Sequence, residues 1–318
     1  MSLRDKFLKS FPPPQYIDVP YSSIAFSDSH LRLLSLDRLK HPAYHAEVKL
    51  ESGIIDKGEV KDMEKLISLL VAQKSKLPSP FIKFSIPDDA SYIFNSEVPA
   101  SPGRDLRESV RFVLEENVPL PLGDVAFDFI PREVQKTADG YKARIVGIAA
   151  SSSLIASYVE SLRKAELEPI ACMHESQATA NAVIAKDFHQ VAVIVHIHLQ
   201  SVGIYIVKDR VVEFSSAVLV SMEDATLALK VIKSEVLKAL EYWSSRLHLI
   251  AETDEALHCF VCGRHDIGKQ LVFEIGEASG MTAELAQVWN NLFSLREYIP
   301  EISFEDSLKY PSAIGLCV

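Results

Sequence analysis

The sequence predicts an α/β protein with two similar lobes and a small α+β subdomain inserted in the first lobe. Residues 22–50 and residues 191–220 each contain three consecutive strand-like stretches, and a helix-like stretch follows each triplet. Between the triplets, residues 100–170 predict a helix, two strands and a second helix, which is typical of a separate small layer. The same order of elements in both halves favours a duplicated architecture, although no clear residue string repeats.

Composition and charge argue against several classes of protein. The chain of 318 residues has a formal net charge of −10, whereas a general nucleic-acid binder needs a basic face. No apolar run approaches the roughly 20 residues that span a bilayer, and the first residues lack the apolar core of a secretion signal. We therefore expect a cytoplasmic protein that reaches the membrane only through a partner. The four cysteines are interpreted as buried, reduced thiols.

Local signals predict individual elements. Asp62 is suited to cap a helix that runs through Gln73. Leu154, Tyr158 and Leu162 lie at helical spacing in a helix over 152–165. The remaining predictions are a short buried strand at 170–173, a long helix at about 224–247, a strand at 258–263 and a helix at about 282–291.

Residues 108–129 form the most informative segment. Val110, Val113 and Leu114 lie at helical spacing, and the following Pro-Leu-Pro sequence ends the helix, because proline cannot continue it. The alternating stretch DVAFDF then predicts a strand. This order of helix, proline turn and strand resembles the inserted subdomain of the PilM family, the actin-like cytoplasmic proteins of type IV pilus assembly.

Further segments resemble that family in the same order, over about residues 20–318. They are GIIDKGEVKDMEKL, FSIPDDASYIFNSEVP, LRKAELEPIACMHESQATANAV, SEVLKALEYWSSRL and YPSAIGLCV. In the third of these, Glu175 takes the place of the family's glutamate near the interlobe hinge. The resemblance implies an actin-like, ribonuclease H-like fold. Its parts would be a first lobe at 20–188 with the subdomain at about 100–170, a trimmed second lobe at 189–307, and a segment at 308–318 that returns to the first lobe.

The nucleotide-binding segments of that family are altered here. In actin-like ATPases each phosphate-binding hairpin usually carries an Asp near the metal and a Gly at the bend. The corresponding residues are Ala25 and Ser27 in the first hairpin and His196 and His198 in the second, while the adenosine-contacting turn keeps Gly263. The chain has only 12 glycines in 318 residues, and phosphate-cradling loops normally depend on glycine for close backbone approach.

Loss of the acidic residues bears on magnesium, because Mg²⁺ prefers oxygen ligands that usually include a carboxylate. Asp28 is the substitute that the first hairpin tip offers. The resemblance therefore implies a pseudo-ATPase with a degenerate nucleotide cleft and no cofactor, with ATP and Mg²⁺ as the alternative. The residues expected in this cleft are Ser27, Asp28, Ser29, His196, His198 and Gly263.

Two clusters of metal-ligating residue types were weighed separately. Cys259 and Cys262 have the spacing of half a zinc site, but no second pair accompanies them, so we interpret them as structural. His196 and His198 lie two apart on a predicted strand and project to one face. We interpret them as filling the space of a lost nucleotide, with a metal or anion site as the alternative. No catalytic residue is assigned.

The resemblance implies a scaffold that binds the cytoplasmic tail of a PilN-like membrane protein as an extended peptide. The residues proposed for this groove are Phe112, Val113, Leu120, Leu122 and Phe127, and for each of them a place in the subdomain core is the alternative. Other functions left open are an active actin-like ATPase or sugar kinase, the cytoplasmic actin-like part of a type II secretion system, and a relative of the division protein FtsA. Homo-oligomers are also compatible with the sequence.

Overall fold

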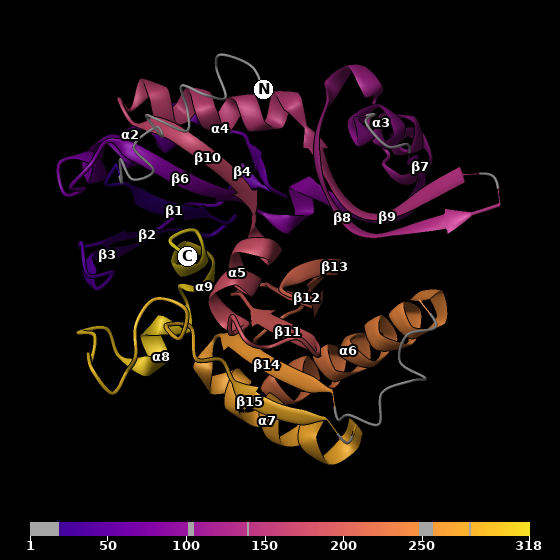
Figure 1. Cartoon of the computed structure of the whole chain (residues 1–318). Helices are drawn as coiled ribbons and strands as arrows, with labels where there is room; N and C mark the ends of the chain where they lie inside the picture. Colours follow the sequence, from indigo (N-terminus) through magenta and orange to yellow (C-terminus); the bar gives the residue numbers. More distant parts are fainter. Residues whose placement is uncertain (1–18, 101–104, 139, 248–256, 280) are drawn as a thin grey trace, which may run out of the picture.

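The computed structural model describes residues 19–100, 105–138, 140–247, 257–279 and 281–318. Two lobes lie one above the other in Figure 1, and a smaller unit projects from the first lobe. Within these residues, each lobe is built on a five-stranded sheet.

The two large sheets have the same topology. The first contains β1 (Ser22–Phe26), β2 (His30–Leu36), β3 (Pro42–Lys49), β6 (Phe81–Ile86) and β10 (Glu168–His174), in the spatial order β10-β6-β1-β2-β3. The second contains β11 (Val191–Ile197), β12 (Ser201–Lys208), β13 (Val211–Leu219), β14 (His258–Gly263) and β15 (Thr282–Leu285), in the order β13-β12-β11-β14-β15. In each, an antiparallel triplet is extended by two parallel strands. The predicted duplication is therefore present in the described chain.

Helices cover the outer faces of both sheets (Figure 1). In the first lobe α2 (Met63–Lys74) and α4 (Ser152–Lys164) pack over a core in which Tyr158 contacts Phe26 and Phe84. Asp62 caps α2 as predicted, because its side chain accepts a hydrogen bond from the backbone N–H of Lys65. In the second lobe α6 (Ala225–Leu247) and α7 (His265–Ser279) take the same role. The short strands β4 (Ile55–Asp56) and β5 (Glu59–Val60) form a hairpin before α2.

The inserted unit is a three-stranded antiparallel sheet with one helix. Its strands are β7 (Ser91–Ala100), β8 (Val125–Thr137) and β9 (Gly140–Ser151), in the order β7-β9-β8, and α3 (Leu106–Asn117) packs on one face. The unit thus spans 91–151, whereas the sequence predicted about 100–170. Both ends differ because β7 pairs with β9 along its whole length, while α4 and β10 pack with the first lobe.

Two local predictions were wrong. Residues 282–291 were expected to form a helix, but β15 pairs with β14 at residues 282–285 and turns follow it, while the helix is α7 at 265–279. The sequence did not predict this helix because it contains Gly268, and glycine disfavours helices. In the structure α7 packs closely on Val261 and Leu285, from which a Cβ on Gly268 would lie only 3.3 Å away. The strand at 170–173 is not buried, since β10 lies at the edge of its sheet and Ile170 is 46% exposed.

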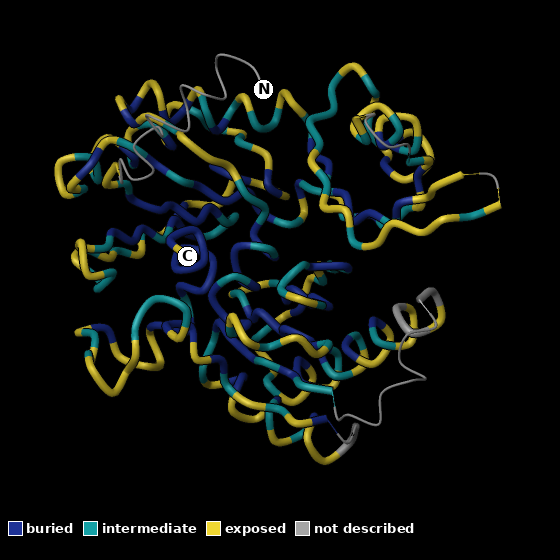
Figure 2. Tube along the Cα trace, in the orientation of Figure 1, coloured by how far each residue is buried: buried dark blue, intermediate teal, exposed yellow. Residues whose placement is uncertain are grey.

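The C-terminal segment packs between the lobes. Helix α9 (Pro311–Gly315) contacts the interlobe helix α5 (Glu175–Val183) and the strand β1, where Ser23 Oγ donates a hydrogen bond to Ala313 O at 2.7 Å. This region is among the most buried of the chain (Figure 2). The short helix α8 (Phe304–Ser307) precedes it. No helix of the described chain is long and apolar enough to cross a membrane.

Gly315 should tolerate no larger residue. A Cβ at this position would lie 1.6 Å from Ala178 O of α5, a backbone atom that can retreat only if a helix moves. We expect Gly315→Ala to lower the free energy of unfolding by about 1–3 kcal/mol or more. Urea unfolding followed by circular dichroism measures this. Gly123→Ala is the matched control, because a Cβ there meets nothing within 4 Å; equal stability of the two variants would contradict the close helix contact.

Candidate functional site

Two sites are built where the parts of the molecule meet: a cleft between the lobes and a groove beside the inserted unit. The cleft begins at the tips of two hairpins, residues 27–29 between β1 and β2 and residues 198–200 between β11 and β12. A small cavity of about 80 Å³ lies between these tips and the first turn of α5. It is lined by Ser27, Asp28, Ser29, Pro87, Asp88, Asp89, Glu175, His198, Gln200, Ser201, Gly203, Tyr205, Ala217 and Leu219.

The polar atoms of the first hairpin tip are already used within the protein. The Asp28 carboxylate accepts hydrogen bonds from the backbone N–H groups of Lys57 at 2.8 Å and Gly58 at 3.0 Å. The Ser27 hydroxyl donates a hydrogen bond to His30 O at 3.0 Å and accepts one from His30 N at 3.1 Å. Asp28 therefore joins the hairpin tip to the β4–β5 turn.

The small cavity is acidic. Four of its lining residues are carboxylic acids, and none of its described lining residues is Lys or Arg. Burial raises the pKa of Glu175 well above its usual value and, with Asp28 and Asp88 nearby, raises that of Asp89. Burial acts in the same direction on Asp88, but the neighbouring His174, the Tyr205 hydroxyl and the Ser176 N–H together lower the pKa of this carboxyl.

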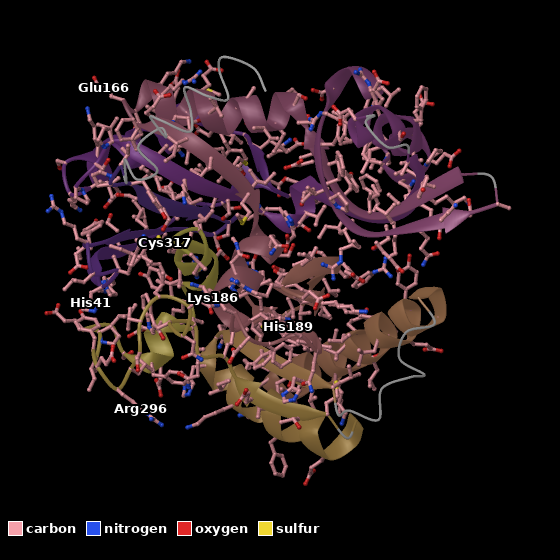
Figure 3. The ribbon with its side chains drawn as sticks, in the orientation of Figure 1. His41, Glu166, Lys186, His189, Arg296 and Cys317 are labelled. Carbon is pink, nitrogen blue, oxygen red and sulfur yellow. The ribbon has the colours of Figure 1, made fainter. Side chains whose placement is uncertain are left out.

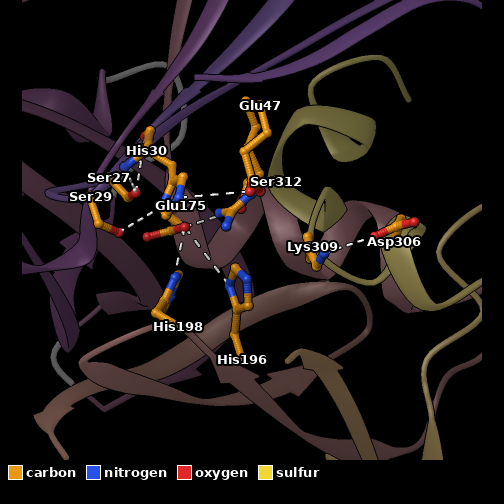
Figure 4. A network of polar contacts seen from close by, with 11 residues as sticks. Ser27, Ser29, His30, Glu47, Glu175, His196, His198, Asp306, Lys309 and Ser312 are labelled. Atoms are coloured by element: carbon orange, nitrogen blue, oxygen red, sulfur yellow. Dashed lines mark hydrogen bonds and ion pairs between the residues drawn. The ribbon is translucent and has the colours of Figure 1, made fainter. Parts of the chain in front are cut away.

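His196 of β11 and His198, at the hairpin tip that follows this strand, face Glu175 across the cleft (Figure 4). Glu175 Oε1 lies 3.8 Å from His196 Nδ1 and 3.8 Å from His198 Nε2. Burial lowers the pKa of His196 well below its usual value, and burial together with the charge of Arg32 lowers the pKa of His198 to about 4. Both rings are therefore neutral at neutral pH.

A wider cavity of about 530 Å³ continues the cleft toward the second lobe. Arg32 and Glu47 form an ion pair at 2.8 Å on one wall, and residues 263–266 form the opposite wall. Gly263 is required here, because its φ is +91° and a Cβ would lie 2.0 Å from Ile197 O. The remaining lining residues are His30, His196, Ile197, His198, Leu199, Glu305, Asp306 and Lys309.

The space between the hairpin tips does not fit magnesium and a triphosphate. Pockets for ligands of drug size usually measure about 300–1,000 Å³, and the space between the hairpin tips is about 80 Å³. A triphosphate placed there would face Asp88, Asp89 and Glu175 without a cationic side chain in the lining. The carboxylate of Asp28, the substitute metal ligand expected from the sequence, is held by two backbone N–H groups.

The structure brings the six predicted cleft residues together around the interlobe space. Ser27, Asp28, Ser29 and His198 line the small cavity, and His196, His198 and Gly263 line the wider one. Sequence reasoning missed Asp88, Asp89 and Tyr205. The first two directly follow Pro87 at the end of β6, and this carboxyl end of a central strand was the available signal. Cys259 and Cys262 point into cores on opposite faces of the second sheet, so they do not share a ligand.

The second site is an apolar groove of about 400 Å³ between the inserted unit and the first lobe. One wall is formed by β8 and β9, where the strand register places Ala126, Ile130, Ile148 and Ala150 on the face away from α3. The opposite wall is the exposed strand β10. The other lining residues are Ile93, Phe127, Asp128, Phe129, Val146, Gly147, Ala149, Ile155, Cys172, Met173, His174, Gln177, Val211 and Val212.

Only Phe127 of the five predicted partner-binding residues lines this groove. Val113, Leu120 and Leu122 pack against the core of the inserted unit, and Phe112 is 82% exposed on α3. These four do not line the groove, because α3 and the proline turn cover the face of the sheet opposite the groove. Sequence periodicity identifies an apolar face but does not tell which of two apolar faces is covered.

A buried ion-pair network fixes the inserted unit against the second lobe. Glu213 of β13 is fully buried, and its Oε1 accepts from Arg144 Nη2 at 2.8 Å and lies 3.3 Å from Arg132 Nε. Asn95 Nδ2 donates to Glu213 O at 2.7 Å. These contacts hold β13 beside β7, so that Val211 and Val212 close one end of the groove.

Sequence comparisons gave no relative: no family model matches the chain, and no curated protein does. Comparison of structures found proteins with a similar fold. The PilM–PilN type IV pilus biogenesis complex contains a chain that superposes with a TM-score of 0.76 at 17% identity, over 94% of this chain and 97% of that chain. The chain has the actin-like fold of PilM. The cytoplasmic domain of EpsL, an inner membrane component of the type II secretion system of Vibrio cholerae, superposes with a TM-score of 0.52 at 11% identity, over 92% of this chain and 94% of that domain. At these identities the likeness shows the fold.

Asp28 should matter for stability rather than for ligand binding. Asp28→Ala leaves the N–H groups of Lys57 and Gly58 without their acceptor, and we expect a loss of about 1–3 kcal/mol in the free energy of unfolding. Urea unfolding measures it. Asp56→Ala, at an exposed position of the same β4–β5 hairpin, is the control and should change stability by less than about 0.5 kcal/mol. Unchanged stability in Asp28→Ala would show that these hydrogen bonds do not hold the hairpin tip.

Proposed function

We propose that this chain is a cytoplasmic, actin-like scaffold at the inner face of the inner membrane, in a type IV pilus or related assembly. In this proposal it binds the cytoplasmic tail of a PilN-like membrane protein and does not hydrolyse ATP. The observation that carries the proposal is the apolar groove between β8 and β10, because both of its walls end in strand edges to which an extended peptide can add.

Each wall offers backbone groups for such a peptide. Among the described strands, β8 pairs only with β9 and β10 only with β6, so each has a free edge. Exposed apolar edge strands are normally protected, because they template pairing with another chain. Ile130 on β8 is 44% exposed, and residues 170–172 of β10 are exposed. Part of the β8 edge is covered, since Phe127 O accepts a hydrogen bond from Arg107 Nη2 at 3.0 Å; this favours pairing along β10.

The groove also supplies specificity. Its lining is mainly aliphatic, and its volume of about 400 Å³ accommodates a few side chains rather than a folded domain. A short apolar peptide fits both the aliphatic lining and the small volume of the groove. The similarity of the fold to PilM, which was solved in a complex with PilN, supports a PilN-like tail as the occupant. The similarity to EpsL makes a tail from a type II secretion partner the second candidate, and titration with both peptides distinguishes them.

Ile130→Glu should weaken peptide binding. A glutamate there would be desolvated beneath the bound peptide without a partner charge, which costs free energy. We expect a Kd at least about tenfold higher, equal to about 1.4 kcal/mol. Fluorescence anisotropy with the labelled N-terminal tail of the PilN-like protein from the same genome measures it. Phe112→Glu, at the exposed position on α3 that the sequence had suggested for the groove, should bind like wild type.

Cys172 provides an independent measurement on the unmodified groove. It is the exposed cysteine of the four, and it lines the groove, whereas Cys259, Cys262 and Cys317 are buried. Although its surface is partly open to solvent, the surrounding apolar walls desolvate the Cys172 thiolate and raise the pKa of this thiol to about 12, so its alkylation is slow but measurable at alkaline pH. Bound peptide should protect Cys172. A peptide that binds but leaves both alkylation and the Ile130→Glu variant unaffected would place its site elsewhere.

The proposal of a pseudo-ATPase is supported by the acidic small cavity and the held carboxylate of Asp28. An active ATPase or sugar kinase needs an anion-compatible space between the hairpin tips. A site that must accommodate phosphate charge beside Asp88 and Asp89 is unfavourable without a compensating cation.

Millimolar Mg-ATP should not stabilise the protein. A native-state ligand present at 100 times its Kd adds about 2.7 kcal/mol to the free energy of unfolding, which would raise the melting temperature by several degrees. We expect a shift of less than about 1 °C in a thermal unfolding experiment. An actin-like ATPase in the same buffer serves as the positive control. A shift of several degrees that requires both ATP and Mg²⁺ would refute the pseudo-ATPase proposal.

A further inference from the structure

Glu175, His196 and His198 bring three metal-ligating groups together where α5 meets β11. His196 lies in β11 and His198 follows the strand two residues later, and their rings lie side by side with centroids 4.0 Å apart. The first turn of α5 places the carboxylate opposite them (Figure 4). Glu175 Oε1 lies 3.8 Å from the facing nitrogen of each ring, and the three ligand atoms all lie within 4.8 Å of one another. These separations are too long for hydrogen bonds, so the three groups lie close together without satisfying one another.

His196 adds an independent observation. Its side chain is 1% exposed, and within the described chain its Nδ1 atom, which points toward Glu175, has no hydrogen-bond partner. Buried polar atoms are nearly always satisfied, so each unsatisfied one calls for an explanation such as an ion. The carboxylate is in turn oriented from behind, because Ser312 Oγ donates to Glu175 Oε1 at 3.3 Å. Such support of a ligand by a neighbouring polar group is typical of metal sites.

We propose that Glu175, His196 and His198 bind one divalent transition-metal ion, with Zn²⁺ as the expected occupant. Two imidazoles and a carboxylate suit zinc and its neighbours, whereas Mg²⁺ prefers an all-oxygen set. Zinc binds nitrogen and oxygen at about 2.0–2.2 Å, which sets tetrahedral ligand atoms about 3.3 Å apart. The two 3.8 Å separations from Glu175 exceed this by about 0.5 Å, and the separation between the two histidine nitrogens is at most 4.8 Å, so the side chains must close around the ion.

The surroundings leave a fourth position for water or an exogenous ligand. His198 lines both cavities of the cleft, Glu175 borders the small one and His196 borders the wider one. The ion therefore has a path to solvent on either side. Glu175 belongs to the interlobe helix, whereas His196 lies in β11 of the second sheet and His198 at the hairpin tip after it. The ion therefore ties the helix to this part of the second lobe, independently of whether the groove holds a peptide.

Zinc binding to the full chain tests the site directly. Protein dialysed against EDTA and then into metal-free buffer is titrated with ZnCl₂ in competition with a chromogenic chelator, and thermal unfolding is followed in parallel. We expect one zinc per chain and a higher melting temperature, because an ion that binds the native state stabilises it. His198→Asn and the isosteric Glu175→Gln should each weaken zinc binding at least about 100-fold.

Controls separate this site from surface histidines and thiols. His189→Asn, which changes a 77% exposed histidine of the second lobe (Figure 3), and Cys172→Ser should both retain zinc. Co²⁺ bound to wild type should give visible d–d bands without thiolate charge-transfer absorption. Circular dichroism in EDTA shows whether each variant folds. If neither ligand variant folds, the cobalt spectrum of the wild-type protein tests the ligand set instead. The proposal is overturned if folded wild type binds no zinc, if both ligand variants keep it, or if Cys172→Ser loses it.

Discussion

The fixed position of α5 is the constraint on which both sites depend. The helix is held at each end by a side chain from elsewhere: Asp88 Oδ1 accepts from Ser176 N at 2.9 Å, and Asn291 Nδ2 donates to Ile184 O at 2.7 Å. Between these ends the backbone of α9 touches α5 so closely that only glycine fits at position 315. From this one element Glu175 enters the cleft and Gln177 borders the groove. A shift of α5 would therefore alter both sites at once.

Buried charge sets how the inserted unit meets the second lobe. A buried ion pair adds little net stability, yet removing one partner is costly, because the other charge remains desolvated. Glu213, with Arg132 and Arg144, therefore acts mainly to specify how the inserted unit meets the second lobe. That orientation places β13 at the end of the groove. A fixed angle suits a protein whose proposed task is to present a peptide-binding surface, whereas the acidic cavity between the hairpins is unsuited to phosphate.

The sequence predicted those features that are set by local chemistry or by segment order. Asp62 marked the start of α2, and the repeated strand triplets predicted two equivalent sheets, because capping and strand periodicity are encoded within a few residues. The resemblance to the PilM family implied that the two hairpin tips and Gly263 lie around one cleft, where the structure places them. What failed depended on tertiary contacts. Gly268 disfavours a helix until close packing on Val261 and Leu285 requires it, and Phe112 resembles a core residue until the sheet shows which face α3 covers.

The groove and the cleft meet in one short stretch of chain. Met173 and His174 line the groove, and the next residue is Glu175. The backbone N–H of Ser176 then donates a hydrogen bond to Asp88 Oδ1. His174 is the N-cap of α5, and its Nδ1 lies 2.7 Å from Ser176 Oγ. If a peptide in the groove displaced residues 173–174, Glu175 would move with them, and the resulting coupling between the two sites would be reciprocal. The strand edge that makes this chain a candidate scaffold and the carboxylate that makes it a candidate metal protein thus meet at the junction of β10 and α5.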